Sequence, residues 1–299
     1  MQDAGKKHCI VTGATSGHGK ACAVALARMG YCVTLLGRNP EKLDRTRAEI
    51  LTSTGREPGI LVCDLSRCSD IERAAGEYKK SGKPLHLLLN NAGVVRRRRE
   101  ETPDGFEMTF AVNYLSMYNL TLRLLDLLLK SGPARIVNVA SDAHRISRLK
   151  LDDLQSKKRY GFMTAYARSK SAVLHFTIEC ARELEGSGVT VNAVDPGPVA
   201  SGIADNNPGL IAGLANFIVR RVFPSPERAA KTALMLCTDP RFDEITGKYY
   251  RFMKEKKPSL DPGDPSKGEK LCRMSAAMTR LDWPPSEPGL RQRTNHFVP

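Results

Sequence analysis

Long hydrophobic runs and clustered cysteines are both missing from this sequence. No segment reaches the roughly 18 uninterrupted apolar residues that a membrane-spanning helix needs. The eight cysteines never occur as C-x-x-C and mostly stand among apolar residues, which favours buried reduced thiols over a disulfide framework or a zinc site. The opening MQDAGKKHCIVTG leaves no room for the apolar region of a secretory signal before its glycine turn. We therefore expect a soluble, cytoplasmic protein without a bound metal.

Acidic residues are also scarce relative to basic ones. The chain has 46 Lys and Arg against 32 Asp and Glu, and its formal net charge is +14. Such a charge favours anionic partners, among which a phosphorylated cofactor, nucleic acid and a membrane surface all qualify. Zinc spacing, an aromatic RNA-binding signature and a basic helix repeat are all absent, so we expect no nucleic-acid partner. Contact with a membrane surface and formation of a homo-oligomer stay open.

Short apolar segments alternate with helix-length stretches along most of the chain. The expected strands cover residues 8–12, 31–36, 59–63, 85–90, 134–140, 189–194 and 248–251. Near-continuous apolar runs such as LHLLL and RIVNVA are typical of a parallel sheet covered on both faces. We predict a single doubly wound α/β domain of the Rossmann type over residues 1–255, with a seven-stranded, mainly parallel sheet. Such domains bind ligands at the carboxyl ends of their strands.

The composition changes from about Lys254 onward. The stretch KEKKPSLDPGDPSKGEK is rich in lysine and proline, which is typical of a linker. For residues 256–299 we expect this linker, one short helix near residues 269–281, and a proline-rich tail.

A glycine-rich turn, TGATSGHG, follows the first expected strand and leads into the helical stretch KACAVALARMG. Glycines there allow the backbone to approach a pyrophosphate that rests on the helix N-terminus. An ordinary turn between a strand and a helix is the alternative. We predict that the turn binds a dinucleotide through Gly13, Ser16, Gly17, His18 and Gly19.

The residues after the second and third strands indicate which dinucleotide binds. NAD-binding domains usually carry an acidic residue after the second strand, but Arg38 stands there in this chain. A guanidinium can pair with the 2′-phosphate of NADP through charge-assisted hydrogen bonds. We therefore expect NADP(H), held by Arg38 and Asn39, with Asp64 and Leu65 near the adenine. An exposed arginine at a helix entrance is the alternative for Arg38.

Tyr166 and Lys170 stand four residues apart in AYARSK, so a helix would place both on one face. An ammonium beside a phenol favours the phenolate and should lower a phenol pKa that is about 10 in water. The tyrosine could then exchange a proton with a substrate oxygen while the cofactor exchanges a hydride with the carbon. Two residues on an ordinary helix surface are the alternative.

The order of four motifs resembles that of the classical short-chain dehydrogenase/reductase family over about residues 6–255. The motifs are TGATSGHG, Asn90-Asn91-Ala92-Gly93, the serine at the end of RIVNVAS, and Y-x-x-x-K. The resemblance implies that Ser141 hydrogen-bonds the substrate oxygen, that Tyr166 is the acid/base, and that Lys170 also holds the nicotinamide ribose. It further implies that Asn113 ties a water into the proton relay, and that the cofactor contacts Asn91, Ala92 and Gly93.

Three further segments, TPDGFEMTFAVN, NVASDAH and KLCRMSAAMTRLDW, are similar to the retinol-dehydrogenase-like branch, which also contains polyprenol-type dehydrogenases. Residues 196–201 resemble the family's PGxVxT, which packs against the nicotinamide. That resemblance implies cofactor contacts by Pro196, Gly197, Val199 and Ser201. Residues 208–223 are apolar and follow the sixth strand, where the family places its substrate lid, so they suggest a bulky apolar substrate. A buried core helix and shallow membrane contact are the alternatives.

The leading hypothesis is an NADP(H)-dependent carbonyl reductase or alcohol dehydrogenase that acts on a small molecule. A non-catalytic NADP-sensing or scaffold protein is the second hypothesis, although such a protein could lose Tyr166 or Ser141. The basic run Arg96 to Arg99 is interpreted first as a solvated loop. The alternative is that it lines the mouth of the substrate site and guides an anionic group.

Overall fold

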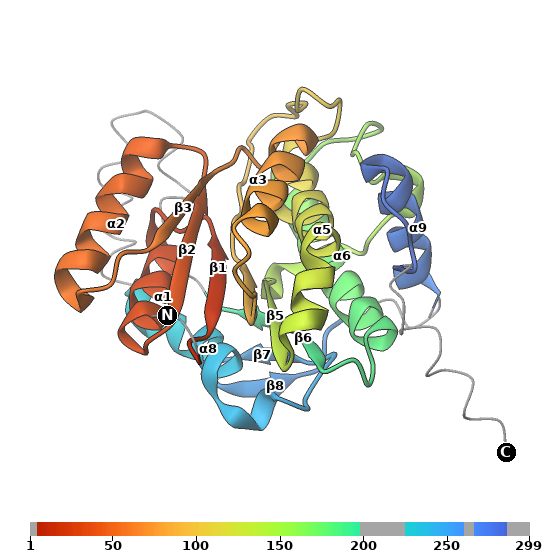
Figure 1. Cartoon of the computed structure of the whole chain (residues 1–299). Helices are drawn as coiled ribbons and strands as arrows, with labels where there is room; N and C mark the ends of the chain where they lie inside the picture. Colours follow the sequence, from red (N-terminus) through yellow and green to blue (C-terminus); the bar gives the residue numbers. More distant parts are fainter. Residues whose placement is uncertain (1–4, 198–224, 260–265, 286–299) are drawn as a thin grey trace, which may run out of the picture.

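The computed structural model describes residues 5–197, 225–259 and 266–285 (Figure 1). Within these residues, eight strands form one sheet in the order β3-β2-β1-β4-β5-β6-β7-β8. The strands are β1 (His8–Thr12), β2 (Cys32–Gly37), β3 (Gly59–Val62), β4 (Leu87–Asn90), β5 (Ala134–Val139), β6 (Val189–Asp195), β7 (Tyr249–Arg251) and β8 (Lys254–Lys256). The first seven run parallel, which confirms the predicted doubly wound α/β fold.

The predicted count of seven strands is wrong by one. Strand β8 pairs antiparallel with β7 through a turn at Phe252 and Met253, whose φ angles are +51° and +62°. The strand lies in the segment that we expected to be a linker, and it contains residue 255, the expected end of the core domain. Its three residues are exposed and charged, as is common in an edge strand, so they carry no apolar strand signal.

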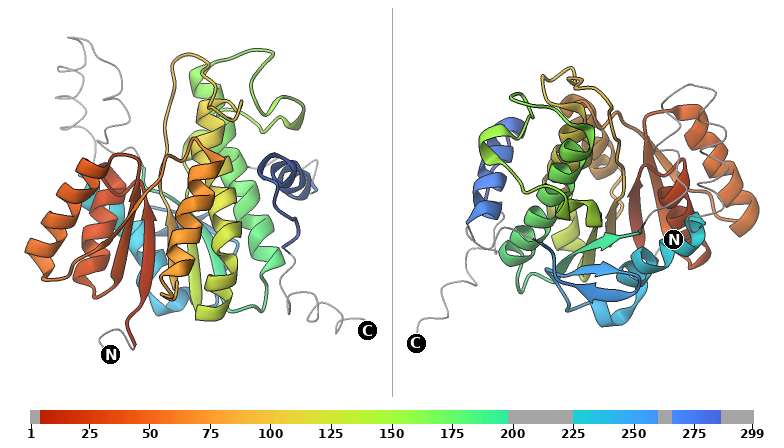
Figure 2. Two further views of the ribbon diagram at one scale, coloured as in Figure 1. Left: turned by 45° about the horizontal axis from the view of Figure 1, so that its top comes forward. Right: turned by 180° about the vertical axis from the view of Figure 1, so that it is seen from behind.

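The two faces of the sheet are covered by different helices (Figure 2). Ile10 and Leu36 belong to one core, and their neighbours Val11 and Leu35 to the other, because successive side chains of a strand point to opposite faces. The first core includes residues of α3 (Cys68–Lys80), α5 (Ser116–Ser131) and α6 (Phe162–Glu183). The second includes residues of α1 (Gly17–Arg28), α2 (Pro40–Thr54) and α8 (Pro226–Thr238).

The expected helix of the C-terminal segment is present as α9 (Lys267–Thr279), which packs against α6. Leu271 and Cys272 on this helix are fully buried. The ring of Trp283, beyond the helix, lies 5.9 Å from the ring of Tyr118 and 6.1 Å from that of Phe176. Since aromatic rings bury large areas, this segment extends the core on the α5–α6 face.

The strand order reverses between β1 and β4, where the chain crosses from one half of the sheet to the other. In open α/β sheets, such a reversal opens a crevice beyond the carboxyl ends of the strands. The turns after β1, β4, β5 and β6 meet at this edge, which places the predicted motifs in one region. No helix in the described parts of the chain has the length and apolarity needed to cross a membrane.

Candidate active site

The turn between β1 and α1 is shaped by its contact with the segment after β4. Gly13 has a φ of +65°, and a Cβ there would lie 3.0 Å from the Cα of Ala92. A Cβ on Gly19 would overlap the side-chain nitrogen of Asn91 and the carbonyl of Gly13. Glycine is therefore required at both positions because two backbone segments approach each other closely.

Three hydrogen bonds and a buried histidine hold these two segments together. The hydroxyl oxygen of Thr12 accepts from the backbone nitrogens of Asn91 at 2.8 Å and Ala92 at 3.0 Å. The Nδ2 of Asn91 donates to the carbonyl of Thr12 at 2.8 Å, so its Oδ1 faces the ring of His18. The Nδ1 of His18 donates to that oxygen, and burial lowers the pKa of the imidazole. His18 thus supports the turn from within.

The turn fits the phosphates of a dinucleotide. The first amides of α1, including those of Gly17 and His18, have no acceptor within the helix, and the positive end of the helix dipole lies there. Phosphate groups bind well at such a helix end, in particular where glycine keeps the backbone accessible. The predicted residues of this turn therefore form a cradle that suits a pyrophosphate.

The residues predicted to select the cofactor lie at the ends of the next two strands. Arg38 is exposed immediately after β2, and the side chain of Asn39 caps α2 by accepting from the amide of Lys42 at 2.8 Å. Asp64, after β3, is half-buried and accepts from the amide and the hydroxyl of Ser66 at 3.0 and 2.8 Å. The exposed guanidinium of Arg38 could pair with a phosphate, whereas Asn39 and Asp64 shape their own turns.

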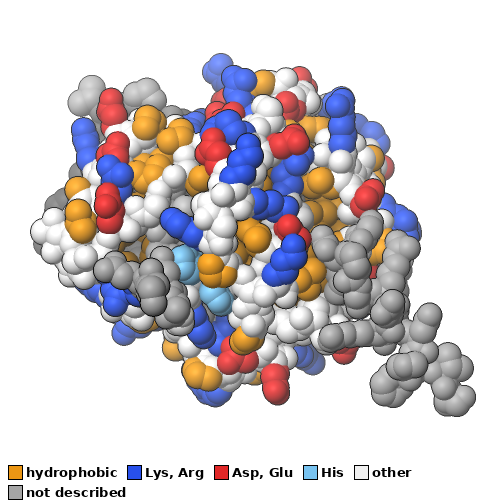
Figure 3. Space-filling view, viewed as in Figure 1, with side chains coloured by type: hydrophobic (Ala, Val, Ile, Leu, Met, Phe, Trp, Pro, Cys, Tyr) orange, Lys and Arg blue, Asp and Glu red, His pale blue; other side chains and the backbone are white. Residues whose placement is uncertain are grey.

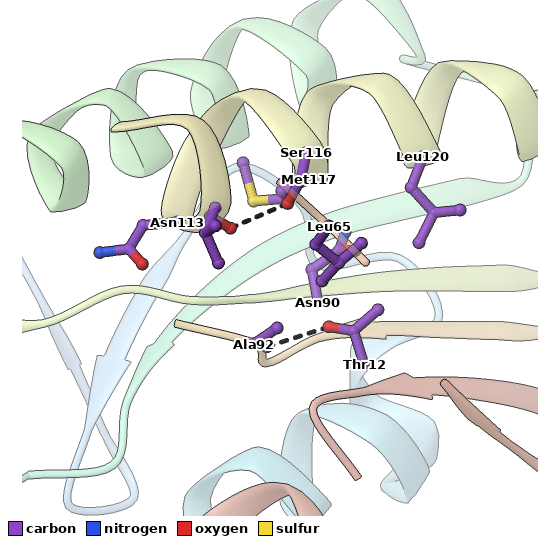
Figure 4. A pocket seen from close by; sticks show the side chains of 9 residues that line it. Thr12, Leu65, Asn90, Ala92, Asn113, Ser116, Met117 and Leu120 are labelled. Carbon is purple, nitrogen blue, oxygen red and sulfur yellow. Dashed lines mark hydrogen bonds between the residues drawn. The ribbon is translucent and has the colours of Figure 1, made fainter. Parts of the chain in front are cut away.

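A small cavity separates the ends of β1 and β4 from the next helical segment (Figure 4). Thr12, Asn90 and Ala92 line it on the strand side, while Asn113 and Ser116 line it on the helix side. The remaining lining residues include Leu65 and Met117. The cavity therefore brings together Leu65, Ala92 and Asn113, three predicted site residues from three separate parts of the sequence.

Asn113 lies in a π-helix (Ala111–Leu115) that joins the short helix α4 (Met108–Phe110) to α5. Its Oδ1 accepts from the amide of Val94 at 2.7 Å, and its Nδ2 donates to the carbonyl of Val94 and the hydroxyl of Ser169, both at 3.0 Å. π-Helical turns occur frequently at functional sites. Here the turn ties the segment after Gly93 to α6.

Ser141, Tyr166 and Lys170 meet beyond the carboxyl end of β5. Ser141 is the N-cap of a short 3₁₀ helix (Asp142–Arg145), and its side chain lies close enough to Tyr166 to lower the pKa of the phenol. The Nζ of Lys170 lies 5.8 Å from the centre of the Tyr166 ring and donates to the carbonyl of Val139 at 2.7 Å. The structure therefore brings together the three side chains expected to handle the proton.

The expected lowering of the Tyr166 pKa by Lys170 is wrong for this geometry. Burial raises the pKa of the Tyr166 phenol, the side chain of Ser141 opposes the rise, and the negative charge of Asp195 adds to it. The ammonium of Lys170 points to the Val139 carbonyl, and burial lowers the pKa of Lys170 to about 8. Spacing in sequence predicts proximity but not burial, which dominates here.

Two residues near Ser141 were missed by the sequence analysis because their contacts are distant in the chain. Asp195 ends β6 and contacts the turn after Ser141, as described below. His144 donates from Nδ1 to the carbonyl of Ser141 at 2.7 Å, and its Nε2 accepts from the amide of Ser259 at 3.0 Å. Only one feature of the sequence pointed to either residue: Asp195 is an acidic residue directly before Pro196-Gly197.

The run Arg96 to Arg99 divides into two paired and two exposed residues. Arg96 lies 3.4 Å from a carboxylate oxygen of Glu100, and Arg99 bonds the carbonyl of Gln155 at 3.1 Å and Glu101 at 2.7 Å. Arg97 and Arg98 are exposed. Figure 3 shows Lys and Arg side chains along the upper rim of the molecule, interspersed with acidic ones. A role of the run at the substrate mouth stays a prediction.

Of the residues predicted to contact the nicotinamide, Pro196 and Gly197 are half-buried directly after β6. The φ of Gly197 is +76°, and a Cβ there would lie 3.0 Å from the ring of Phe252. Val199, Ser201 and residues 208–223 lie outside the described residues.

Comparison with known proteins shows similarity over most of the chain. The family described as short chain dehydrogenase matches residues 7–208. Mouse retinol dehydrogenase 12 is 37% identical over 279 residues, which cover 93% of this chain and 87% of that protein. Human polyprenol dehydrogenase is 37% identical over 255 residues, which cover 83% and 77%. A short chain dehydrogenase from Escherichia coli CFT073, solved with NADPH, matches with a TM-score of 0.66 and 27% identity over 82% of this chain and 95% of its own.

Proposed function

The chain belongs to the short-chain dehydrogenase family, in its retinol-dehydrogenase-like branch, and on that premise we propose that it transfers a hydride between NADP(H) and the oxygen-bearing carbon of a bulky apolar alcohol, aldehyde or ketone. The observation that carries this proposal is the assembly of Ser141, Tyr166 and Lys170 at one point beyond β5. These side chains have no evident structural reason to meet there. Their chemistry suits acid–base work on an oxygen atom.

When bound, the nicotinamide cofactor supplies or accepts the hydride. The adjoining hydroxyls of Ser141 and Tyr166 can both hydrogen-bond one substrate oxygen. During reduction Tyr166 gives its proton to that oxygen, and during oxidation it takes the proton back. The Nζ of Lys170 lies near the face of the Tyr166 ring, and its hydrogen bond to the Val139 carbonyl holds it there. The family resemblance implies that Lys170 also holds the cofactor's ribose.

A preference for NADP(H) over NAD(H) follows from the charge at the end of β2. Arg38 is exposed there, and the adjacent α2 begins with Pro40, so a 2′-phosphate would approach both a guanidinium and a helix N-terminus. The bacterial relative that is solved with NADPH supports the same cofactor.

The apolar nature of the substrate is proposed from two sources. The relatives in this branch are named for retinol and polyprenol, which are long apolar alcohols. In addition, residues 208–223 of this chain are mostly apolar and follow the strand next to the site.

An assay of NADPH absorbance tests the proposed function. Purified full-length protein is mixed with NADPH and a panel of retinal-like, polyprenal-like and steroid ketone substrates, and in the reverse direction with NADP⁺ and the alcohols. We expect turnover with at least one long apolar compound and faster turnover with NADPH than with NADH. Lack of turnover across the panel, with NADPH still bound, would instead favour a nucleotide-sensing protein.

Cytoplasmic location stays a proposal that rests on the sequence alone. Fractionation of cells that express the tagged full-length chain tests it, because a protein held on membranes sediments with them at moderate salt. The same preparation, passed over a sizing column, tests whether the chain forms a homo-oligomer.

A further inference from the structure

Asp195 is a buried carboxylate beside the proposed active site. It is the last residue of β6, and only 4% of its side chain is exposed. A carboxylate at such a position is costly unless hydrogen bonds and an opposite charge compensate it. Its surroundings supply both.

Two backbone amides from different turns donate to this one carboxylate. The amide of Asp142 donates to Oδ2 at 2.9 Å, and the amide of Gly197 donates to Oδ1 at 2.8 Å. Asp142 follows Ser141, and Gly197 lies in the turn that we expect to contact the nicotinamide. Asp195 therefore joins the turn that carries a catalytic hydroxyl to the turn that faces the cofactor.

Arg251, in the neighbouring strand β7, supplies the opposite charge. Its Nε lies 3.1 Å from Oδ2 of Asp195, and its Nη1 lies 2.8 Å from a carboxylate oxygen of Asp142. The guanidinium also lies over the ring of Phe252, 4.7 Å from its centre. Because it contacts both carboxylates and an aromatic face, the arginine is held in one orientation.

The charge on Asp195 acts on the proton-handling side chains. Burial raises the pKa of Tyr166 most, Ser141 lowers it, and the charge of Asp195 raises it further. For Lys170, burial lowers the pKa and the charge of Asp195 opposes that lowering. It also raises the pKa values of His18 and His144 against the effect of burial. The charged and titratable groups around it come from α1, the turn after β5, α6 and β7: His18, Asp142, His144, Arg145, Tyr166, Lys170, Tyr249 and Arg251.

We propose that Asp195 and Arg251 are a positioning pair for the reaction: the carboxylate fixes the Ser141 turn against the Pro196-Gly197 turn, and the balance of the two charges sets the pH range in which Tyr166 exchanges its proton. The proposal rests on the proposed role of Tyr166. Neither residue needs to touch the substrate or the cofactor. Their effect passes through two turns and through the local electrostatic potential.

The two halves of the pair predict opposite effects. Asp195→Asn keeps the shape of the side chain but removes its negative charge, so the phenolate of Tyr166 becomes easier to form and the pH profile moves to lower pH. Arg251→Met removes the compensating positive charge, so the profile moves to higher pH. A neighbouring charge commonly shifts a pKa by about one unit or more, which sets the expected size of each movement. Arg251→Lys should restore the wild-type profile in part.

The first experiment measures kcat/KM for alcohol oxidation with NADP⁺ from pH 6 to about 10 in wild type, Asp195→Asn, Arg251→Met and Arg251→Lys. Opposite movements of the Asp195→Asn and Arg251→Met profiles support the proposal. Equal losses of rate at every pH, or movements in the same direction, would overturn it, because a merely structural pair predicts no difference in sign.

The second experiment needs no turnover. Histidine ring signals are followed by NMR across pH in the full-length protein with NADPH bound, and His18→Gln and His144→Gln variants assign the two relevant signals. In Asp195→Asn, both histidines should titrate at lower pH than in wild type, whereas His86, directly before the amino end of β4, should not move. Unchanged titration of His18 and His144 would overturn the electrostatic part of the proposal in an active or inactive protein. Failure of the proposed function would appear separately, as a wild-type protein without turnover.

Discussion

The Nδ1 of His18 lies 2.8 Å from the Oδ1 of Asn91, 73 residues further along the chain, and this contact joins the glycine turn to the segment after β4. Replacement of His18 by leucine would keep most of the buried volume of the side chain but leave the partly buried Oδ1 of Asn91 without its donor. An unsatisfied buried acceptor costs about 1–3 kcal/mol, so we expect a loss of stability of that size and a higher Kd for NADPH.

His86→Leu is the matched control for His18→Leu, since His86 accepts a hydrogen bond from the amide of His8 at the amino ends of the strands. Denaturant titration and NADPH fluorescence measure both variants. Loss of stability in each, with weaker NADPH binding in His18→Leu alone, fits a role of His18 in the cofactor turn. Equal Kd values for the two variants would contradict that role.

Arg38→Ala should reduce the preference for NADPH over NADH. The guanidinium stands exposed at the end of β2, and loss of a charge-assisted pair with the 2′-phosphate costs about tenfold to a hundredfold in kcat/KM for NADPH. Arg45, on α2, is also an exposed arginine, so Arg45→Ala is the control and should keep the wild-type ratio of kcat/KM for NADPH to kcat/KM for NADH. Equal use of both cofactors by the wild type would reject the assignment of Arg38.

Lys170→Met should abolish activity and yet stabilise the fold near neutral pH. Burial lowers the pKa of Lys170 to about 8, from 10.5 in the unfolded chain, so the folded state is penalised wherever the lysine must be charged. That penalty is fully present below pH 8 and fades as the pH rises toward 10.5, where the unfolded chain also loses the proton.

The stability of Lys170→Met relative to wild type should therefore be greatest at pH 7, on the order of 1–3 kcal/mol, and should shrink as the pH approaches 10. Urea unfolding at pH 7, 8.5 and 10 measures the difference. A constant difference over this range would show that Lys170 is not held in a depressed state.

Arg99 and Arg98 are adjacent but should differ in their effect on stability. Arg99 bonds the Gln155 carbonyl and Glu101, so Arg99→Ala should cost about 1 kcal/mol. Arg98 is exposed, and Arg98→Ala should stay within about 0.5 kcal/mol of wild type. Thermal unfolding compares the two. A similar loss in both would mean that the whole run is structural, whereas a rise in KM for acidic substrates alone in Arg98→Ala would support a role at the substrate mouth.

The sequence predicts those parts of the site that depend on local patterns. The glycine turn, Arg38 at the end of a strand, and the Tyr166–Lys170 spacing are each readable within a few residues, and the parallel sheet follows from the repeated alternation of strand and helix. Strand β8 escaped notice because an exposed edge strand of three charged residues carries no apolar period.

Contacts between distant segments were not predictable in the same way. Asp195 contacts Asp142 from 53 residues away in the sequence, and Arg251 contacts Asp142 from 109 residues away, so no local sequence spacing predicts either contact. The direction of the Tyr166 pKa also depends on burial, which arises only when α6 packs against the sheet. Sequence patterns thus located the reacting groups, while their electrostatic environment required the fold.

Whether Tyr166 transfers the proton is tested most directly by kcat/KM of Tyr166→Phe with NADPH and an accepted carbonyl substrate. The variant loses the transferable proton but little shape, so kcat/KM should fall by about 10²- to 10⁴-fold while the Kd for NADPH stays close to wild type. Tyr250→Phe, a buried tyrosine on the α1–α8 face, should keep full activity. If Tyr166→Phe keeps more than about a tenth of the wild-type rate, the loss is smaller than removal of a general acid causes, and Tyr166 does not transfer the proton.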